Sequence, residues 1–365
     1  MVQAPFPGRI AIVTNTFEQN SEEFLSAQAL VLRYGSDRVI HRTWPVMFAA
    51  EPQLMIRTLE ELASDPEVGA IIINQAVVNT NMAIDAARAI RGDDIFIVVA
   101  SPAEDPRDVS ARVDLALDTN FPAIGQAFVA QAIEMGAEAI VHISFPRHMA
   151  VPMLATRRDN MAEAARRVGI PFHEVNSIDP LGEGGMAAAQ LYIAENVGRW
   201  VEQFGVNTAF FSTNCGQQIP LLQQILEYGA IYVQPCCPSP FHAFPSAFGI
   251  GIGPELPEEQ FSHSEMVEAT RQVIHAAGMQ GRLSNWALPG SWTWTNVGFR
   301  YAIEWLNGNV SQEIGVVEMN VIHRLIGDYA YELYGERMYM ELDNLRVGND
   351  VFPLYVVGIS PFIVY

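Results

Sequence analysis

The end of one predicted strand carries side chains suited to binding an anion. The apolar run Ala139–Ile143 is followed within five residues by Phe145, Arg147 and His148. A guanidinium presents a planar fork of N–H donors that matches a carboxylate, and an imidazole adds a further hydrogen-bonding group. Because ligands bind beyond the carboxyl ends of parallel strands, we expect these three residues to contact a ligand with an acidic group. A surface loop with a salt bridge is the alternative interpretation.

Aromatic side chains gather in a later segment, Gly281–Thr295, which holds three of the six tryptophans of the chain. Trp286 and Trp292 are candidates to stack on a ring or a sugar, because aromatic groups supply a large apolar contact area. Polar neighbours on both sides of Trp292 favour it for this role. The alternative is that these side chains belong to the core.

Three cysteines are too few for a disulfide framework, and no His, Cys or Asp set has the spacing of a metal site. We therefore expect no metal, although His148, Cys215, Cys236 and His242 all lie near predicted strand ends or in one Pro-rich loop and could converge. Cys215 and Cys236 follow consecutive predicted strands, so a bridge is geometrically possible if those strands are neighbours. We expect free thiols, because the short turn at 235–238 can point the side chains apart.

Other predicted strand ends supply further candidates for ligand contact. They are Thr16, Phe17 and Glu18 after Arg9–Thr14, Gln75 after Gly69–Ile73, Ser101 after Ile95–Ala100, and Asn214 with Cys215 after Thr208–Ser212. Arg158 is a weaker candidate, since it lies in a basic stripe with Arg157 on the predicted helix Pro152–Val168 and a solvated helix face is the favoured interpretation. His242, in the Pro-rich loop, is a further weak candidate for ligand contact, with a hydrogen-bonded structural histidine favoured.

The elements that position these residues alternate between apolar strands and helices, which is typical of parallel sheets buried on both faces. The pattern runs to about residue 120 and then restarts, and 365 residues are too many for one ordinary core. The sequence thus predicts an α/β protein with two Rossmann-like lobes, each a parallel sheet flanked by helices, joined by a multi-strand hinge. We expect an N-terminal lobe at 1–121, completed by part of 283–365, and a C-terminal lobe at 122–282. The segment 283–365 then provides a crossover, a long helix and closing strands shared between the lobes.

Composition excludes several functions. The net charge is −20, which disfavours nucleic acid and anionic membrane surfaces as partners. All 21 basic residues are arginine, so a lysine Schiff base, pyridoxal-phosphate chemistry and a Walker-A lysine are excluded, and no cofactor is expected.

Targeting signals are not evident in the sequence. No apolar run reaches the length of a transmembrane helix, and Met1–Pro5 leads almost directly into the first strand without a recognisable secretory signal. We expect an extracytoplasmic protein, periplasmic or lipid-anchored, whose export signal is absent from this sequence. A cytoplasmic location is the alternative.

Several motifs resemble the type 1 periplasmic binding protein superfamily, which includes ribose-binding proteins and the core of lac-repressor-type regulators. Gly125–Ala127 is similar to the lobe crossing of that superfamily, and Arg157–Met161 to a helix of the second lobe in which an arginine often reaches the ligand. The stretch 237–250, together with Trp286–Pro289, resembles an uncharacterised bacterial branch. The resemblance implies the fold and binding in a cleft, and it names no ligand. With the first strand at Arg9, we expect no helix-turn-helix of the repressor type.

The segment 214–222 also resembles the second catalytic cysteine loop of aspartate/glutamate racemases. Two-base racemisation needs a thiol from each lobe, and no cysteine precedes Cys215. A cysteine hydrolase would need a positioned base, for which His148 or His242 could serve.

These observations favour a solute-binding protein, not an enzyme, that closes two lobes on a small polar or carboxylated metabolite for uptake or sensing. Its partners would be that ligand and a membrane transporter or sensor, without insertion of the protein into the membrane. Two alternatives stay open: a cleft enzyme that uses Cys215, and a cytosolic ligand-responsive regulator.

Overall fold

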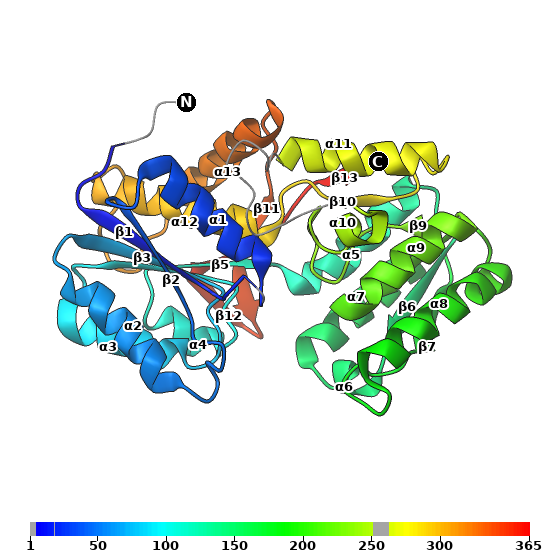
Figure 1. Ribbon diagram of the computed structural model, residues 1–365, viewed down its shortest axis with the longest axis horizontal. Helices are drawn as coiled ribbons and strands as arrows, with labels where there is room; N and C mark the ends of the chain where they lie inside the picture. The colour runs from blue at the N-terminus through cyan, green and yellow to red at the C-terminus, as the bar shows by residue number, and fades with distance from the viewer. Residues whose placement is uncertain (1–4, 18, 251–262) are drawn as a thin grey trace. The chain divides into compact units, whose positions relative to one another are not determined.

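The computed structural model describes residues 5–17, 19–250 and 263–365, so the candidate Glu18 lies outside the described residues. The chain divides into two compact units (Figure 1). Among the described residues, unit 1 comprises 5–119 and 290–358, and unit 2 comprises 120–250, 263–289 and 359–365. Each unit has its own sheet and its own core.

Unit 1 is built on a seven-stranded sheet in the order β11-β12-β5-β4-β3-β1-β2. Its central strands are parallel and buried on both faces, as their Val- and Ile-rich sequences predict. The strands are β1 (Arg9–Thr14), β2 (Val39–Thr43), β3 (Val68–Asn74), β4 (Phe96–Ala100), β5 (Leu115–Thr119), β11 (Glu341–Val347) and β12 (Asp350–Ile359).

Helices cover both faces of this sheet. One layer contains α1 and α12, with α13 packed on α12, and the other contains α2 and α3 (Figure 1). Gly298 lets α12 approach the sheet closely, since a Cβ there would lie 3.0 Å from a methyl carbon of Val98. The helices are α1 (Ser21–Tyr34), α2 (Pro52–Ser64), α3 (Thr80–Arg91), α4 (Pro106–Ser110), α12 (Gly290–Leu306) and α13 (Met319–Tyr334).

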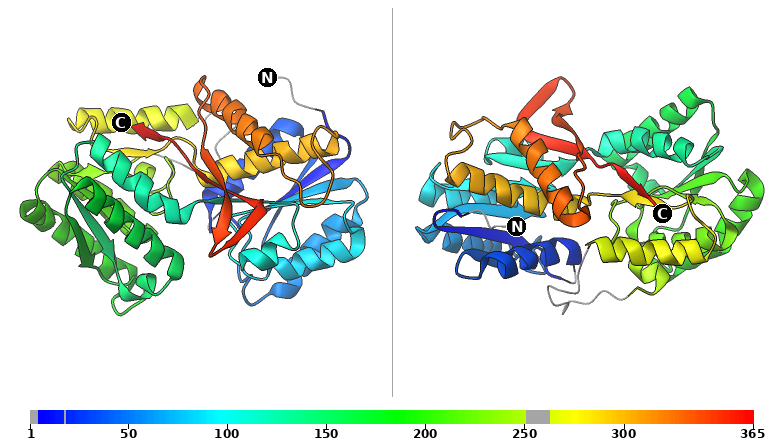
Figure 2. Two further views of the ribbon diagram at one scale, coloured as in Figure 1. Left: turned by 180° about the vertical axis from the view of Figure 1, so that it is seen from behind. Right: turned by 90° about the horizontal axis from the view of Figure 1, so that it is seen from above.

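Unit 2 is built on a parallel four-stranded sheet in the order β7-β6-β8-β9, with a two-stranded antiparallel sheet of β10 and β13. Helix α5 packs on α7, and α8 on α9 (Figure 2). Its elements are α5 (Phe121–Glu134), β6 (Ala139–Ser144), α6 (Pro146–Met149), α7 (Pro152–Val168), β7 (Phe172–Asn176), α8 (Gly185–Phe204), β8 (Thr208–Ser212), η1 (Cys215–Gln217), α9 (Gln218–Tyr228), β9 (Ile231–Tyr232), α10 (Phe244–Phe248), α11 (His263–Ala276), β10 (Ser284–Trp286) and β13 (Phe362–Val364).

The structure confirms the predicted fold class of parallel α/β sheets flanked by helices. Strand β2 was not predicted, because it lies at the sheet edge and ends in polar, exposed residues that break the apolar pattern. Strands β12 and β13, near the C-terminal end of the chain, do not pair with each other. Strand β12 lies inside the sheet of unit 1, parallel to β5, and β13 pairs with β10 in unit 2. Tertiary pairing, which a local pattern does not encode, decides both placements.

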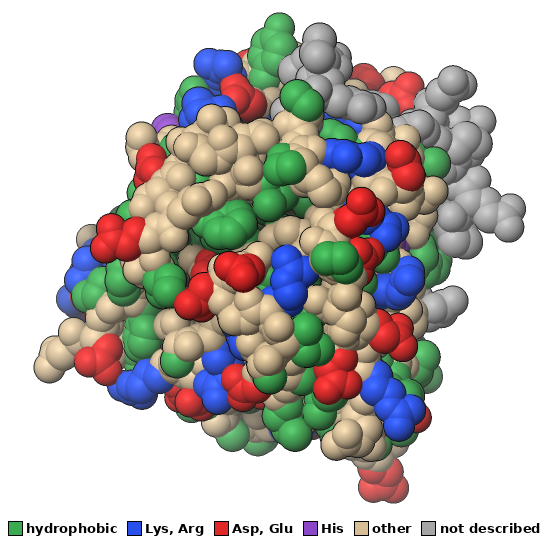
Figure 3. All heavy atoms as spheres, turned by 90° about the vertical axis from the view of Figure 1, so that its left-hand side faces the viewer, with side chains coloured by type: hydrophobic (Ala, Val, Ile, Leu, Met, Phe, Trp, Pro, Cys, Tyr) green, Lys and Arg blue, Asp and Glu red, His purple; other side chains and the backbone are tan. Residues whose placement is uncertain are grey.

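The described surface in Figure 3 carries arginine and acidic side chains interspersed with one another, without a continuous basic patch. Among the described residues, no helix is both long enough and apolar enough to span a membrane.

Candidate functional site

Several side chains, most of them polar, lie together at the carboxyl ends of β6 and β8 in unit 2. The hydroxyls of Ser144 and Thr213 are hydrogen-bonded at 2.9 Å, and Nδ1 of His148 lies 3.0 Å from the Thr213 hydroxyl. The imidazole packs on the Phe145 ring, with 4.1 Å between the ring centroids. We call Ser144, Phe145, His148 and Thr213 the strand-end cluster. It forms because β6 and β8 are parallel neighbours, which brings residues 69 positions apart in sequence to one edge.

The electrostatics of the strand-end cluster keep its imidazole neutral. Burial lowers the pKa of His148, and the positive charge of Arg147 lowers it further. A neutral imidazole donates one hydrogen bond and accepts another. Since Nδ1 is engaged with Thr213, Nε2 is the atom that can reach a bound molecule.

Buried amides fix the turn that follows β8. Gln217 accepts a hydrogen bond from Ser212 at 2.8 Å and donates one to Ser177 at 3.0 Å. Gln218 donates to the carbonyl oxygens of Ser212 and Asn214, and accepts from the Tyr232 hydroxyl at 2.6 Å. The turn that presents Asn214 and Cys215 is thus held by groups from neighbouring strands.

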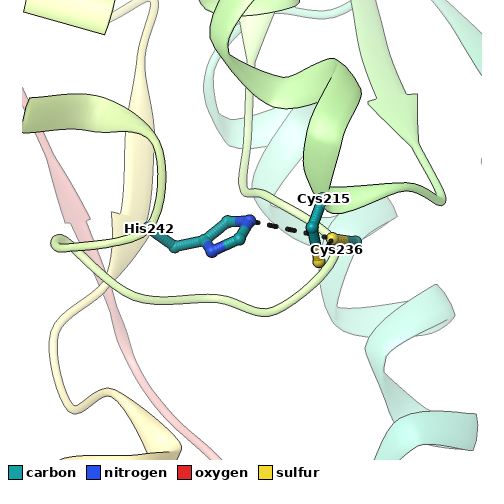
Figure 4. A group of neighbouring side chains, drawn as sticks. All are labelled: Cys215, Cys236 and His242. Carbon is teal, nitrogen blue, oxygen red and sulfur yellow. Dashed lines mark hydrogen bonds between the residues drawn. The ribbon is translucent and has the colours of Figure 1, made fainter. Parts of the chain in front are cut away.

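Three thiols and one imidazole converge beside this turn. Figure 4 shows Cys215, Cys236 and His242. Sγ of Cys215 lies 3.0 Å from Sγ of Cys236 and 3.7 Å from Sγ of Cys237, and Sγ of Cys236 lies 3.9 Å from Nε2 of His242. All three cysteines are free, and Cys215 and Cys237 are exposed. The convergence that the sequence left open thus includes Cys215, Cys236 and His242, whose ligand atoms all lie within 4.8 Å of one another, and does not include His148.

A buried guanidinium lies beneath the thiols. Arg157 is 1% exposed, donates from Nη1 to the Cys236 carbonyl oxygen at 3.4 Å, and lies 4.8 Å above the Phe211 ring. Its Nε and Nη2 have no hydrogen-bond partner among the described residues. The pKa of the Cys237 thiol lies well below its usual range, because Cys215 and Cys236 hydrogen-bond to it and Arg157 adds positive charge.

The other arginine candidates are engaged in ion pairs. Arg147 binds both carboxylate oxygens of Asp179 at 2.8 Å and lies 5.2 Å from the Phe145 ring centroid, so it borders the strand-end cluster. Arg158 pairs with Glu174 at 2.7 Å and Asp159 at 2.6 Å. The shared solvated face expected for Arg157 and Arg158 is wrong for Arg157, because adjacent residues on a helix point about 100° apart and only Arg157 turns inward.

The two tryptophan candidates belong to different units. Trp286 is completely buried in unit 2, where it packs with Ile124 and donates from Nε1 to Gln234 at 3.0 Å. Trp292 lies near the start of α12 in unit 1 and is 6% exposed. Trp286 therefore serves as core of unit 2.

The strand ends of unit 1 hold two buried carboxyl groups that sequence reasoning missed. Asp118, in β5, accepts hydrogen bonds from the Thr119 N–H at 2.7 Å, the Tyr355 hydroxyl at 3.0 Å and the Ser101 side chain, and burial raises its pKa to about 7. Glu23, in α1, accepts from the Asn15 N–H at 2.8 Å, and burial raises its pKa to about 8. A carboxylate among apolar residues of a predicted strand or helix face is the signal that could have identified them.

The remaining candidates in unit 1 make local contacts. The Thr16 hydroxyl contacts Gln19 at 3.3 Å, and the Phe17 ring packs edge-on against Phe24. The Gln75 carbonyl oxygen accepts from Trp44 at 3.3 Å. Thr16 and Phe17 follow β1 and Gln75 follows β3 of the same sheet, and each of the three is partly accessible.

The family described as "Protein of unknown function (DUF3798)" matches residues 9–284. The chain belongs to this family. Two uncharacterised proteins of Treponema pallidum (strain Nichols) are similar to this DUF3798 chain. One is 28% identical over 172 residues, covering 47% of this chain and 79% of the relative. The other is 30% identical over 179 residues, covering 47% and 80%.

Solved structures show that the DUF3798 chain has the type 1 periplasmic binding protein fold. A Clostridium difficile 630 protein, provisionally named a transcriptional regulator, matches with a TM-score of 0.86 at 20% identity over 99% of this chain and all of that chain. A sugar ABC transporter protein of Actinomyces odontolyticus matches with a TM-score of 0.55 at 10% identity, covering 85% and 86%. A periplasmic ribose ABC transporter protein of Conexibacter woesei matches at 0.51 and 11%, covering 90% and 97%. At these identities the likeness establishes the fold alone.

Proposed function

We propose that this DUF3798 protein is a solute-binding protein whose two units close on a small polar or carboxylated metabolite, for uptake or sensing. The observation that carries the proposal is the strand-end cluster of unit 2, where hydroxyl and imidazole groups end adjacent parallel strands. Ligands of open α/β sheets bind at that edge. The fold, shared with proteins named as sugar ABC transporter components, supports the same function.

The chemistry of the cluster defines the ligand class. A neutral His148 and two hydroxyls suit a molecule that both donates and accepts hydrogen bonds, such as a polyol, a sugar or an amide. Arg147 adds a fork for a carboxylate and would exchange its contact with Asp179 for the ligand. In unit 1, Thr16, Phe17, Gln75, Ser101 and Trp292 are the proposed ligand contacts, with Asn214 as a further one in unit 2.

A thermal-shift screen tests this function. The probes are monosaccharides, amino acids, nucleosides and dicarboxylates, and a true ligand raises the melting temperature as its concentration rises. His148→Gln and Thr213→Val should weaken the binding of the best probe by about tenfold or more, the loss of one to two hydrogen bonds. Arg166→Gln, in an exposed ion pair with Glu163 on α7, is the matched control and should bind normally. The proposal is contradicted if no probe binds, or if the best probe binds His148→Gln and Thr213→Val as tightly as it binds the wild type.

The enzyme alternative predicts turnover. Incubation with the same probes followed by mass spectrometry distinguishes the two functions. Conversion of a probe by the wild type but not by Cys215→Ala would show that the protein is an enzyme that uses Cys215. A binding protein leaves every probe chemically unchanged.

A ligand-responsive regulator is the second candidate, favoured by the provisional name of the Clostridium difficile protein with the same fold. Fractionation of cells that express the native gene separates the two. Protein outside the cytoplasmic membrane supports uptake or surface sensing, and protein in the cytoplasm supports regulation.

A further inference from the structure

We call Cys215, Cys236, Cys237 and His242 the thiol cluster of unit 2. Solute binding does not require these four side chains to lie together, and their distances are close to those of a zinc site. In a tetrahedral zinc site, Zn–S distances of about 2.3 Å place sulfur atoms roughly 3.8 Å apart, and Zn–N distances of about 2.0 Å place S and N roughly 3.5 Å apart. Here the Cys215–Cys237 and Cys236–His242 distances are 3.7 and 3.9 Å, and Cys215 and Cys236 are 3.0 Å apart. The ligand atoms of Cys215, Cys236 and His242 all lie within 4.8 Å of one another. Cys237 is outside that group but lies 3.7 Å from Cys215, so its side chain must turn towards the other three to complete the site.

The donor set selects the kind of ion. Thiolate and imidazole together suit zinc, whereas Mg²⁺ and Ca²⁺ require oxygen ligands. A four-cysteine iron–sulfur cluster is excluded, because the chain has three cysteines.

Charge balance involves the buried arginine. Three thiolates, one neutral imidazole and Zn²⁺ carry a net charge of −1, and the adjacent guanidinium of Arg157 carries +1. A buried cation without an anionic partner is costly, and two N–H groups of Arg157 lack partners among the described residues. A zinc–thiolate centre supplies the missing negative charge.

The protein holds the ligands on a rigid frame. Cys215 opens η1, where the Asn214 side chain accepts from the Gly216 N–H at 2.9 Å. The loop between Cys236 and His242 is fixed by Asn285, which donates to the Ser239 carbonyl oxygen at 2.6 Å. Such fixed supports are what a preorganised metal site needs.

We propose that Cys215, Cys236, Cys237 and His242 form a zinc site in unit 2, with Arg157 as its buried counter-charge. The inference does not depend on the solute-binding function proposed above. Deprotonation of the thiols on binding makes the zinc affinity fall at low pH.

Titration of the reduced, metal-free full chain with Zn²⁺ and with Co²⁺ under anaerobic conditions tests the site. We expect one ion per chain, and Co²⁺ should give thiolate-to-metal charge-transfer absorption with the ligand-field bands of a tetrahedral centre. Cys215→Ser, Cys237→Ser and His242→Gln should each weaken zinc binding by about 100-fold or more, beyond the 10–100-fold typical for losing a residue that only hydrogen-bonds to a metal ligand. His275→Gln, an exposed histidine of α11, is the control and should bind like the wild type.

Three outcomes would overturn the proposal. The first is less than one equivalent of zinc bound by reduced, folded protein. The second is a Co²⁺ spectrum without thiolate bands, and the third is a Cys215–Cys236 disulfide that forms readily in the presence of zinc. If the chain binds no zinc but binds Cu(I), with the same affinity in the wild type and in His242→Gln, the cluster would be a copper site with thiolate ligands alone. Because Cys236 is buried and its loss could unfold the chain, the test relies on the accessible Cys215, Cys237 and His242.

Discussion

The two units bury different kinds of ionisable side chain near their sheets, acidic in unit 1 and basic in unit 2. Unit 1 buries carboxyl groups, Glu23 and Asp118, whose pKa values burial raises to about 8 and about 7. Unit 2 buries the guanidinium of Arg157 and the imidazole of His142, whose pKa burial lowers to about 3. Asp118 accepts three hydrogen bonds and is satisfied within its unit, whereas Arg157 leaves N–H groups without partners among the described residues. Glu23 of unit 1 also leaves one carboxylate oxygen without a partner among the described residues. Each unit therefore keeps a buried ionisable group with unused hydrogen-bonding capacity, an acid in unit 1 and a base in unit 2.

The largest expected effect is alkaline destabilisation of unit 1. The folded pKa of Glu23, about 8, lies above the unfolded value near 4.5, so its contribution to stability is complete at acid pH and is lost as pH rises through 8. The free energy of unfolding should fall by roughly 3–5 kcal/mol from pH 5 to pH 9. Urea unfolding at several pH values measures this loss, which Glu23→Gln should reduce to the part that Asp118 contributes and which the exposed Glu61→Gln should leave unchanged. An unchanged pH profile in Glu23→Gln would break the comparison.

Acid destabilisation of unit 2 should be slightly smaller. The folded pKa of His142, about 3, lies below the unfolded value of 6.5, so its contribution is complete near neutrality and is lost as pH falls from 6.5 towards 3. The expected loss is roughly 3 kcal/mol between pH 7 and pH 4. His142→Phe, between the rings of Phe172 and Phe211, should remove the part that His142 contributes. The part that remains in unit 2 belongs to His263, whose pKa burial also lowers to about 3. Because His41 in unit 1 also has a lowered pKa, hydrogen exchange must assign the transition to unit 2.

A pair of Thr→Val variants compares the hydroxyl networks directly. Thr295 of unit 1 is buried and accepts hydrogen bonds from Ser26 and Asn74. Thr295→Val removes both bonds, although each partner keeps a second one, and should cost about 2 kcal/mol of unfolding free energy. Thr213→Val should cost slightly less, about 1–1.5 kcal/mol, because the buried Ser144 loses its hydrogen bond whereas His148 is only half-buried and can turn to water. Chemical denaturation of both variants tests the order, and a larger cost at Thr213 would mean that the cluster is structural.

The smallest effect is expected at Arg147. Its ion pair with Asp179 is exposed, and exposed pairs contribute little to stability. Arg147→Gln should leave the melting temperature unchanged while weakening the binding of carboxylated probes. A clear loss of stability would assign Arg147 to the fold and not to a ligand.

Sequence reasoning could predict the fold class and one half of the strand-end cluster, because apolar runs with polar ends mark β6 and β8 directly. It could not separate Arg157 from Arg158, since the two differ only in the direction that each takes from the helix. The meeting of Cys215 with His242 depends on the pairing of β8 with β9 and on a loop held by Asn285. Such long-range contacts leave no local pattern.

Hydrogen–deuterium exchange with the best probe from the thermal-shift screen tests the central claim most directly. The claim is that a small polar ligand binds at the carboxyl ends of the parallel strands. We predict slower exchange in peptides that contain residues 144–151 and 213–218 of unit 2, and in those that follow β1, β3 and β4 of unit 1. Protection confined to other segments, with these peptides unchanged by a saturating probe, would contradict the account.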